Sequence, residues 1–100
     1  MDKKIFRAYD IRGIYPTEIN EGVVLEIGKA LGRYFGKGKI VIGHDIRLSS
    51  PTLYGALKDE MVKIEKIEIL EAGLVTTPML YFLVNNLKAV GGIMVTASHN

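Results

Sequence analysis

The sequence lacks cysteine, a long apolar run and an excess of charge of one sign. Without cysteine the chain has no disulfide, no thiol nucleophile and no cysteine-based metal cluster. No stretch approaches the roughly 18 apolar residues of a membrane-spanning helix, and 24% of the residues are charged, which excludes a membrane protein. The first residues lack the apolar segment of a secretory signal, so we expect a cytoplasmic protein.

The charge balance does not favour a nucleic-acid partner. The formal net charge is only +2, and the basic residues form no dense run. Lys29, Arg33 and Lys37 recur at helical spacing, which is typical of a solvated helix face rather than a polyanion site. We therefore expect neither nucleic acid nor membrane among the partners.

What is present is enough apolar sequence for one small core. Hydrophobic residues make up 48% of the 100 residues, which excludes a disordered tail. The length allows at most one domain.

Short apolar runs alternate with helical patterns along the chain. Strand-like runs occupy residues 5–11, 39–43, 67–73 and 89–96. Between them, apolar residues recur every three or four positions and predict three helices, whose stripes are Val24, Ile27, Leu31, Tyr34 and Phe35, then Leu53, Leu57, Met61 and Ile64, then Leu80, Leu83, Val84 and Leu87. This order of elements is typical of a layered α/β sheet.

Capping residues locate the ends of these helices. The first helical pattern runs from Asn20 onward, and Gly36 and Gly38 are placed to stop it. Ser50 followed by Pro51, and Thr77 followed by Pro78, each predict an N-cap with proline at the first helical position.

Three polar segments follow apolar strands, at the end of the sheet where open α/β folds bind ligands. They are residues 10–13, residues 43–47 with Ser49 and Ser50, and residues 96–100. We expect any functional site to be built from these loops.

Ser98 is a candidate nucleophile in the last of these loops. A serine hydroxyl needs a base or a group to donate before it reacts. His99 is adjacent, but neighbours on an extended chain point to opposite faces, so we do not expect a Ser98–His99 catalytic pair. The alternative is an ordinary turn of Ser, His and Asn.

Two arginines leave a similar choice open. Arg12 and Arg47 each follow an aspartate by two positions, and each either fixes its loop through an ion pair or faces a phosphate. Gly13 and Gly43 would permit a close backbone approach. We interpret His44 as a loop residue rather than a metal ligand.

Four stretches, in order, resemble one known family. Residues 6–13 (FRAYDIRG) resemble the opening motif of the α-D-phosphohexomutases, the phosphomannomutase/phosphoglucomutase family. The further matching stretches are residues 43–50 (GHDIRLSS), 73–82 (GLVTTPMLYF) and 91–100 (GGIMVTASHN), the last resembling the phosphoserine loop. His44 stands where an arginine is commoner in the family. Together the motifs span nearly all of the chain.

The resemblance implies a three-layer α/β/α sandwich with a mostly parallel (mixed) four-stranded sheet. Residues 1–100 would form most of the N-terminal domain of a four-domain enzyme, truncated within the active-site loop. The metal loop, the sugar-reading loop and the distal phosphate site would lie on the remaining domains of the same chain. We therefore expect the chain alone to be inactive and to self-associate through apolar faces.

The family mechanism centres on Ser98. The resemblance implies that Ser98 carries a phosphoryl group and donates it to a hexose 1-phosphate. A glucose or mannose 1,6-bisphosphate then serves as intermediate and activator, and the 6-phosphate is released. Mg²⁺ would bind against the phosphoserine and take one ligand oxygen from it. Such a transfer depends on positioning and charge stabilisation.

The other site residues follow from the same resemblance. Tyr9 and Arg12 match positions that line the crevice near the transferred phosphate, and His99 matches one that contacts it. Arg47 and Asn100 are assigned to shaping the loop. The hexose itself is not specified by these residues.

Two alternatives remain open. Phosphoglucosamine mutase is the nearest one within the superfamily, although its opening motif usually carries a Thr-Asp-Gly pattern where this chain has Tyr9 to Arg12. The other is a non-catalytic α/β module that binds phosphosugars or nucleotides without using Ser98.

Overall fold

A computed structural model describes residues 7–15, 19–45 and 50–99, with the side chains of residues 10–13, 19–45 and 52–96. Four strands alternate with three helices along the chain. The elements are β1 (Arg7–Tyr15), α1 (Glu21–Phe35), β2 (Gly38–His44), α2 (Ser50–Met61), β3 (Ile67–Leu74), α3 (Thr77–Asn86) and β4 (Gly91–His99).

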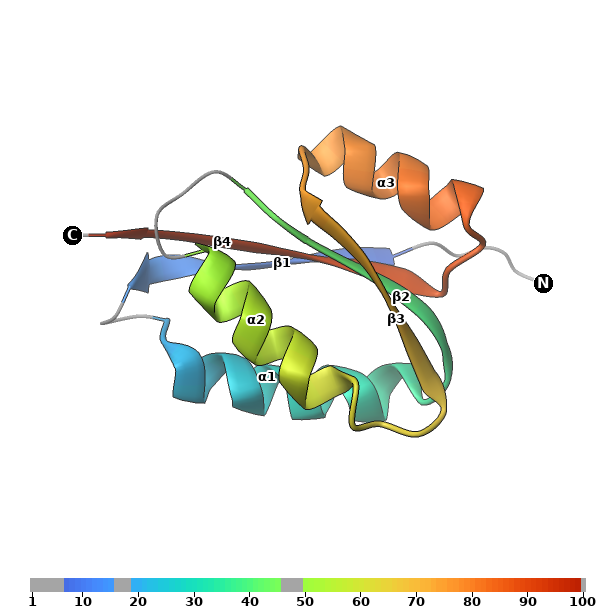
Figure 1. Cartoon of the computed structure of the whole chain (residues 1–100), viewed down its shortest axis with the longest axis horizontal. Helices are drawn as coiled ribbons and strands as arrows, with labels where there is room; N and C mark the ends of the chain where they lie inside the picture. The colour runs from blue at the N-terminus through green and yellow to red at the C-terminus, as the bar shows by residue number, and fades with distance from the viewer. Residues whose placement is uncertain (1–6, 16–18, 46–49, 100) are drawn as a thin grey trace.

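The strands form one sheet in the order β1-β4-β2-β3. All three pairings are parallel, so the expected mostly parallel α/β sheet is confirmed, with no antiparallel pair among the described strands. Helices α1 and α2 lie on one face of the sheet and α3 lies on the other, which gives three layers (Figure 1).

Each face of the sheet has its own core. On the α1–α2 side the fully buried residues include Ile40, Ile42, Leu53, Leu57, Met61, Ile93 and Val95. On the α3 side the core is smaller and consists of Val41, Val75, Leu80, Val84, Ala89 and Met94. The continuous apolar run of β2 is explained by this arrangement, because alternate residues must be buried on both faces.

The predicted limits of α1 are confirmed. The Asn20 side chain accepts a hydrogen bond from the backbone N–H of Val23 at 3.0 Å. Gly36 ends the helix with a φ of 76°, a conformation that favours glycine. One residue of the predicted apolar stripe is wrong, since Tyr34 is 60% exposed while Val24 is buried.

The other two helices begin one residue earlier than predicted. Thr76, not Thr77, caps α3, because its hydroxyl accepts from the backbone N–H of Met79 at 3.3 Å. Pro78 therefore occupies the second helical position, where its missing N–H leaves no intrahelical bond unmade. In α2, Ser50 is itself the first helical residue, and the cap position before it lies outside the described residues.

Strands β1 and β4 extend further than predicted. Residues 10–13 and 96–99, expected in loops, belong to these two strands. The pairing between β1 and β4 continues to Tyr15 opposite His99, so each strand satisfies backbone groups of the other through the polar segment.

Candidate functional site

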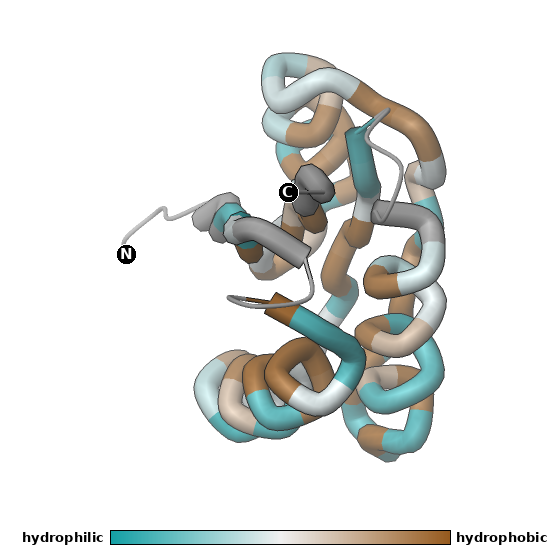
Figure 2. Tube along the Cα trace, turned by 90° about the vertical axis from the view of Figure 1, so that its left-hand side faces the viewer, coloured by the Kyte–Doolittle hydropathy of each residue, from teal (hydrophilic) through white to brown (hydrophobic). Residues whose placement is uncertain are grey.

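The parallel sheet brings the carboxyl ends of its strands to one edge. Strands β1, β2 and β4 end at the left of Figure 1, and Figure 2 looks onto that edge. Open α/β sheets bind ligands at such an edge. The polar segments predicted to form the site therefore lie at the edge where such a sheet binds ligands.

On the α3 side of this edge lies a cavity of about 380 Å³, called here the α3-side pocket. Its polar lining comes from four separate parts of the chain. These residues are Arg12 of β1, Asp45 after β2, Thr76 and Thr77 at the start of α3, and Thr96 of β4. Its apolar lining is Leu74, Val75, Met79 and Met94.

The side chain of Val75 packs directly against the backbone of Gly43 beside this pocket. An added Cβ at Gly43 would lie 2.5 Å from Cγ2 of Val75. The pairing of β2 with β3 shifts by one residue here, and Gly73 has a φ of 70°. The Val75 backbone N–H then donates to the His44 carbonyl at 3.0 Å, which brings Thr76 and Thr77 to the pocket.

Arg12 makes the ion pair that was one of its two predicted roles, and its position leaves the second role, binding a phosphate, open. Its guanidinium lies 3.6 Å from the Asp10 carboxylate, so the local ion pair exists. The Arg12 side chain is nevertheless 65% exposed and lines the pocket, opposite Thr96 in the β1–β4 register. It can therefore bond an anion there, since a guanidinium presents several donors at once.

Thr96 lies in a segment that the sequence predicts as a loop, and no motif marks it as a site residue. It is 9% exposed, and it is the one buried polar residue in the described part of the chain. Its position on the α3 face follows from alternation with Val95, which packs in the opposite core. Strand periodicity carried through to Thr96 would have identified it.

Five further predicted site residues lie partly or wholly outside the described part of the structure. The backbone of Ser98 and His99 ends β4, opposite Ile14 and Tyr15. The side chains of Ser98, His99 and Tyr9 lie outside the described residues. Arg47 and Asn100 lie outside them entirely.

On the other face of the same edge, His44 packs against α2. Its ring meets that of Tyr54 edge to face, with centroids 4.8 Å apart. Nδ1 of His44 is 2.9 Å from the carbonyl oxygen of Asp45, so this nitrogen carries the proton and donates. The interpretation of His44 as a loop residue is wrong, because His44 is the last residue of β2.

Tyr54 anchors α2 to β3 through a small polar network. Its hydroxyl donates to Oε1 of Glu71 at 3.2 Å, and Nζ of Lys58 lies 3.4 Å from Oε2 of the same carboxylate. Burial, followed by the negative charge of Glu71, raises the pKa of Tyr54 to about 12. Tyr54 therefore stays protonated near neutral pH and acts as a donor.

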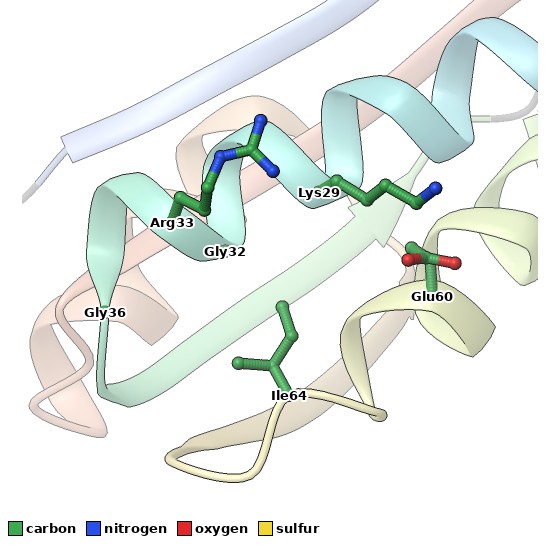
Figure 3. Close-up of a pocket in the computed structure, with 6 residues that line it drawn as sticks. All are labelled: Lys29, Gly32, Arg33, Gly36, Glu60 and Ile64. Carbon is green, nitrogen blue, oxygen red and sulfur yellow. The ribbon is translucent and has the colours of Figure 1, made fainter.

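A second cavity, of about 420 Å³, lies between α1 and the end of α2, away from the carboxyl edge (Figure 3). The side chain of Ile64 points across this cavity toward Gly32 of α1. The side chains of Lys29 and Arg33, also on α1, line it as well. Lys29, Arg33 and Lys37 are all exposed, as expected of a solvated helix face.

The described residues contain no group of three or more His, Asp or Glu side chains that could hold a metal ion. The carboxylates nearest the candidate site are Asp10, which is paired with Arg12, and Asp45. The side chain of Ser98, against which Mg²⁺ is expected, lies outside the described part of the chain. Within the same part, no helix is both long and apolar enough to cross a membrane.

Comparison with known proteins decides the family. Residues 3–100 match the model of phosphoglucomutase/phosphomannomutase, alpha/beta/alpha domain I. The chain belongs to this family. The phosphohexomutase domain I fold agrees with the observed layers, and the resemblance of the four sequence motifs is confirmed.

Several mutases are similar to this domain I chain. Proteins named phosphohexose mutases from Xanthomonas campestris pv. campestris (strain B100) are 47% identical over 95 residues, covering 95% of this chain and 21% of the relative. The phosphomannomutase of Escherichia coli K12 is 42% identical over 95 residues, which cover 95% of this chain and 21% of the relative. That of Methanocaldococcus jannaschii is 38% identical over 103 residues, covering 99% of this chain and 21% of the relative.

The chain thus spans about a fifth of the length of these relatives. No solved structure matches the chain.

Proposed function

We propose that this domain carries the phosphoserine of a hexose-phosphate mutase acting on mannose and glucose phosphates. The observation that carries the proposal is the domain I match over residues 3–100, which includes Ser98. The names of the relatives, phosphomannomutase and phosphohexose mutase, support the substrate class. The backbone of Ser98 at the carboxyl end of β4 fits a ligand site at that edge.

In the proposed reaction, phosphorylated Ser98 donates its phosphoryl group to the free hydroxyl of a hexose 1-phosphate. The bond between Oγ and phosphorus breaks, a new bond to the sugar oxygen forms, and the proton of the sugar hydroxyl ends on the departing Ser98 Oγ. In the second half the Ser98 hydroxyl attacks the 1-phosphate of the bound 1,6-bisphosphate, the bond between the C1 oxygen and phosphorus breaks, and that oxygen takes the serine proton, so that the sugar leaves as the 6-phosphate and Ser98 is phosphorylated again.

Arg12 is the described residue best placed to assist this transfer. Charge develops on the oxygens of the transferring group, and donors aimed at them lower the barrier. Tyr9 and His99 are proposed to contact the same group, and Arg47 and Asn100 to shape the loop around it.

A Mg²⁺ ion against the phosphoserine is part of the proposal, as is a cytoplasmic location. Because the described residues form no metal cluster, its further ligands would come from other parts of the complete enzyme.

The test is the complete enzyme that contains this domain, with and without Ser98→Ala. We expect Ser98→Ala to abolish turnover of mannose 1-phosphate and glucose 1-phosphate. We also expect intact mass to show one phosphoryl group that maps to Ser98 and is lost on phosphatase treatment. Full activity in Ser98→Ala would contradict the proposal and favour the non-catalytic binding module.

The same enzyme distinguishes the sugar. Relative turnover of mannose, glucose and glucosamine phosphates ranks the substrates directly. Dominance of glucosamine phosphate would replace the proposed substrate with that of phosphoglucosamine mutase.

A further inference from the structure

Thr96 is a buried polar residue to which the proposed reaction has so far given no role. It lies near the end of β4, on the α3 face of the sheet, and is only 9% exposed. No hydrogen bond joins its hydroxyl to any residue within the described ranges. A hydroxyl buried without a partner destabilises a fold, and valine would fill the same space without that cost. The Thr96 hydroxyl therefore needs a partner that the described residues do not supply.

This hydroxyl opens onto the α3-side pocket. No side-chain oxygen among the described residues is both fully buried and without a hydrogen bond. Because the Thr96 hydroxyl makes no such bond, its oxygen must be reachable from the pocket that Thr96 lines. Met94, two residues earlier on the same face of β4, gives the pocket an apolar wall. The polar end of this strand face is thus directed at the space that a ligand would occupy.

The residue beside Thr96 limits what that ligand can be. Arg12 is the register partner of Thr96 on the adjacent strand β1, and its side chain lines the same pocket. A guanidinium only donates hydrogen bonds, whereas a threonine hydroxyl donates or accepts. A group that bonds to both residues must therefore present acceptor oxygens, as a phosphoryl group does.

The proposed reaction supplies a phosphoryl group close by. Ser98 follows Thr96 by two residues in β4, so its backbone occupies the next position on the same face of the sheet. Two residues of a strand span about 7 Å. A phosphoryl group on a serine and the hydroxyl of a threonine can together bridge a separation of this size.

We propose that the Thr96 hydroxyl donates a hydrogen bond to an oxygen of the phosphoryl group that Ser98 carries. This inference rests on the proposed function, because it needs a phosphorylated Ser98. The bond holds the phosphoryl group in one orientation for attack by the sugar hydroxyl, and neither a proton nor the phosphoryl group is transferred to Thr96. Such alignment lowers the barrier because the reacting atoms are positioned before they react.

Substitutions of Thr96 in the complete enzyme test the bond. Thr96→Val keeps the shape of the side chain and removes the hydroxyl, and Thr96→Ala removes the hydroxyl together with the methyl group. Thr96→Ser keeps the hydroxyl. We expect kcat to fall by about tenfold in Thr96→Val and Thr96→Ala, and to stay within about twofold of the wild type in Thr96→Ser.

Thr52→Val is the matched control. It makes the same chemical change at an exposed position of α2, a helix on the opposite face of the sheet, and should leave kcat unchanged. Circular dichroism checks that each variant is folded. Because the described residues offer the Thr96 hydroxyl no partner, Thr96→Val should not lower the melting temperature of the dephosphorylated enzyme. A lower melting temperature would assign the hydroxyl a structural bond and contradict the proposal.

Phosphorus NMR of the phosphorylated enzyme gives a readout that does not depend on turnover. A donated hydrogen bond favours the dianion of a phosphate group, so its loss raises the pKa of the phosphoserine. We expect Thr96→Val to raise this pKa and Thr96→Ser to keep the wild-type value. Arg12 and Asp45, the charged side chains of the described pocket lining, are the same in both variants.

The results separate this inference from the proposed function. An unchanged phosphoserine pKa in Thr96→Val, or an unchanged kcat, would overturn the inference while Ser98 remained phosphorylated. A decrease in kcat that Thr96→Ser shares in full would also overturn it, since the hydroxyl would then not be the cause. A wild-type enzyme that never carries a phosphoryl group on Ser98 would instead contradict the proposed function itself.

Discussion

Arg12 illustrates how one side chain can be held by the fold and still be available to a ligand. Its ion pair with Asp10 is solvent-exposed, and exposed pairs of this kind contribute little to stability. The guanidinium is therefore free to exchange Asp10 for a phosphate at low cost. Its presence in the α3-side pocket is what gives this residue a place in the proposed reaction.

Arg12→Lys tests that role. Lysine keeps the positive charge but loses the two parallel hydrogen bonds that a guanidinium makes to a phosphate. We expect kcat of the complete enzyme to fall by roughly 100-fold. Arg33→Lys, on the exposed face of α1, is the control and should leave kcat unchanged. Equal activity of both variants would remove Arg12 from the mechanism.

Tyr54 has a structural role that can be measured separately. Tyr54→Phe removes its hydrogen bond to Glu71, and we expect the free energy of unfolding to fall by about 1 kcal/mol in urea titrations. Glu71 keeps Lys58 and is half exposed, so its carboxylate is not left buried. Tyr81→Phe is the control, because the Tyr81 side chain is exposed. It should change the free energy of unfolding by about 0.5 kcal/mol at most.

The same residue predicts a dependence on alkaline pH. The folded pKa of about 12 lies above the ordinary value of 10.0, so the unfolded chain loses this proton first. The contribution of Tyr54 is therefore complete below pH 10 and is lost as the pH rises toward 12. Tyr54→Phe should lose less stability than the wild type over that interval. An equally steep loss in both would assign it to other groups.

At the scale of elements, the start of α3 separates two threonines that look equivalent in the sequence. Thr76→Ala removes the hydroxyl that accepts from Met79, and we expect a loss of about 1 kcal/mol in the free energy of unfolding. Thr77→Ala is the matched control. Because Thr76 and not Thr77 is the N-cap, this change should lower the free energy of unfolding by about 0.5 kcal/mol at most. A larger loss in Thr77→Ala would restore the cap assignment made from the sequence.

The helices and buried strands were predictable because their burial is periodic. Val24, Leu53, Leu57, Leu80 and Val84 recur at helical spacing and are buried. The ends of β1 and β4 were not, since Asp10, Arg12 and Thr96 are polar residues within strands. What extends those strands is pairing between segments at opposite ends of the chain, which leaves no local pattern.

The candidate site was predictable in position more than in composition. The rule for parallel sheets predicts a site at the carboxyl edge, and the sequence indicates Arg12 as a candidate phosphate-binding residue there. Thr76, Thr77 and Thr96 line the pocket only because the Gly43 contact and the β1–β4 register bring them together. Such convergence depends on tertiary distances, which residue spacing does not contain.

At the scale of the whole molecule, the chain covers about a fifth of its relatives. We expect the isolated 100-residue chain to show no turnover of glucose 1-phosphate, because a phosphoserine dianion would lack most of its compensating charge. A coupled assay for glucose 6-phosphate, with the complete enzyme as positive control, measures this. Turnover by the purified chain would show that the remaining domains are dispensable.

The neighbouring positions of β1 and β4 have a consequence for synthesis on the ribosome. Arg7 pairs with Gly91, which is translated 84 positions later. Strand β1 must wait for β4, while β2, α2 and β3 can already assemble through short connections. Until β4 is complete, the β1 segment carries unpaired backbone along its whole length. Chaperone binding and premature association during translation should therefore concentrate on residues 7–15.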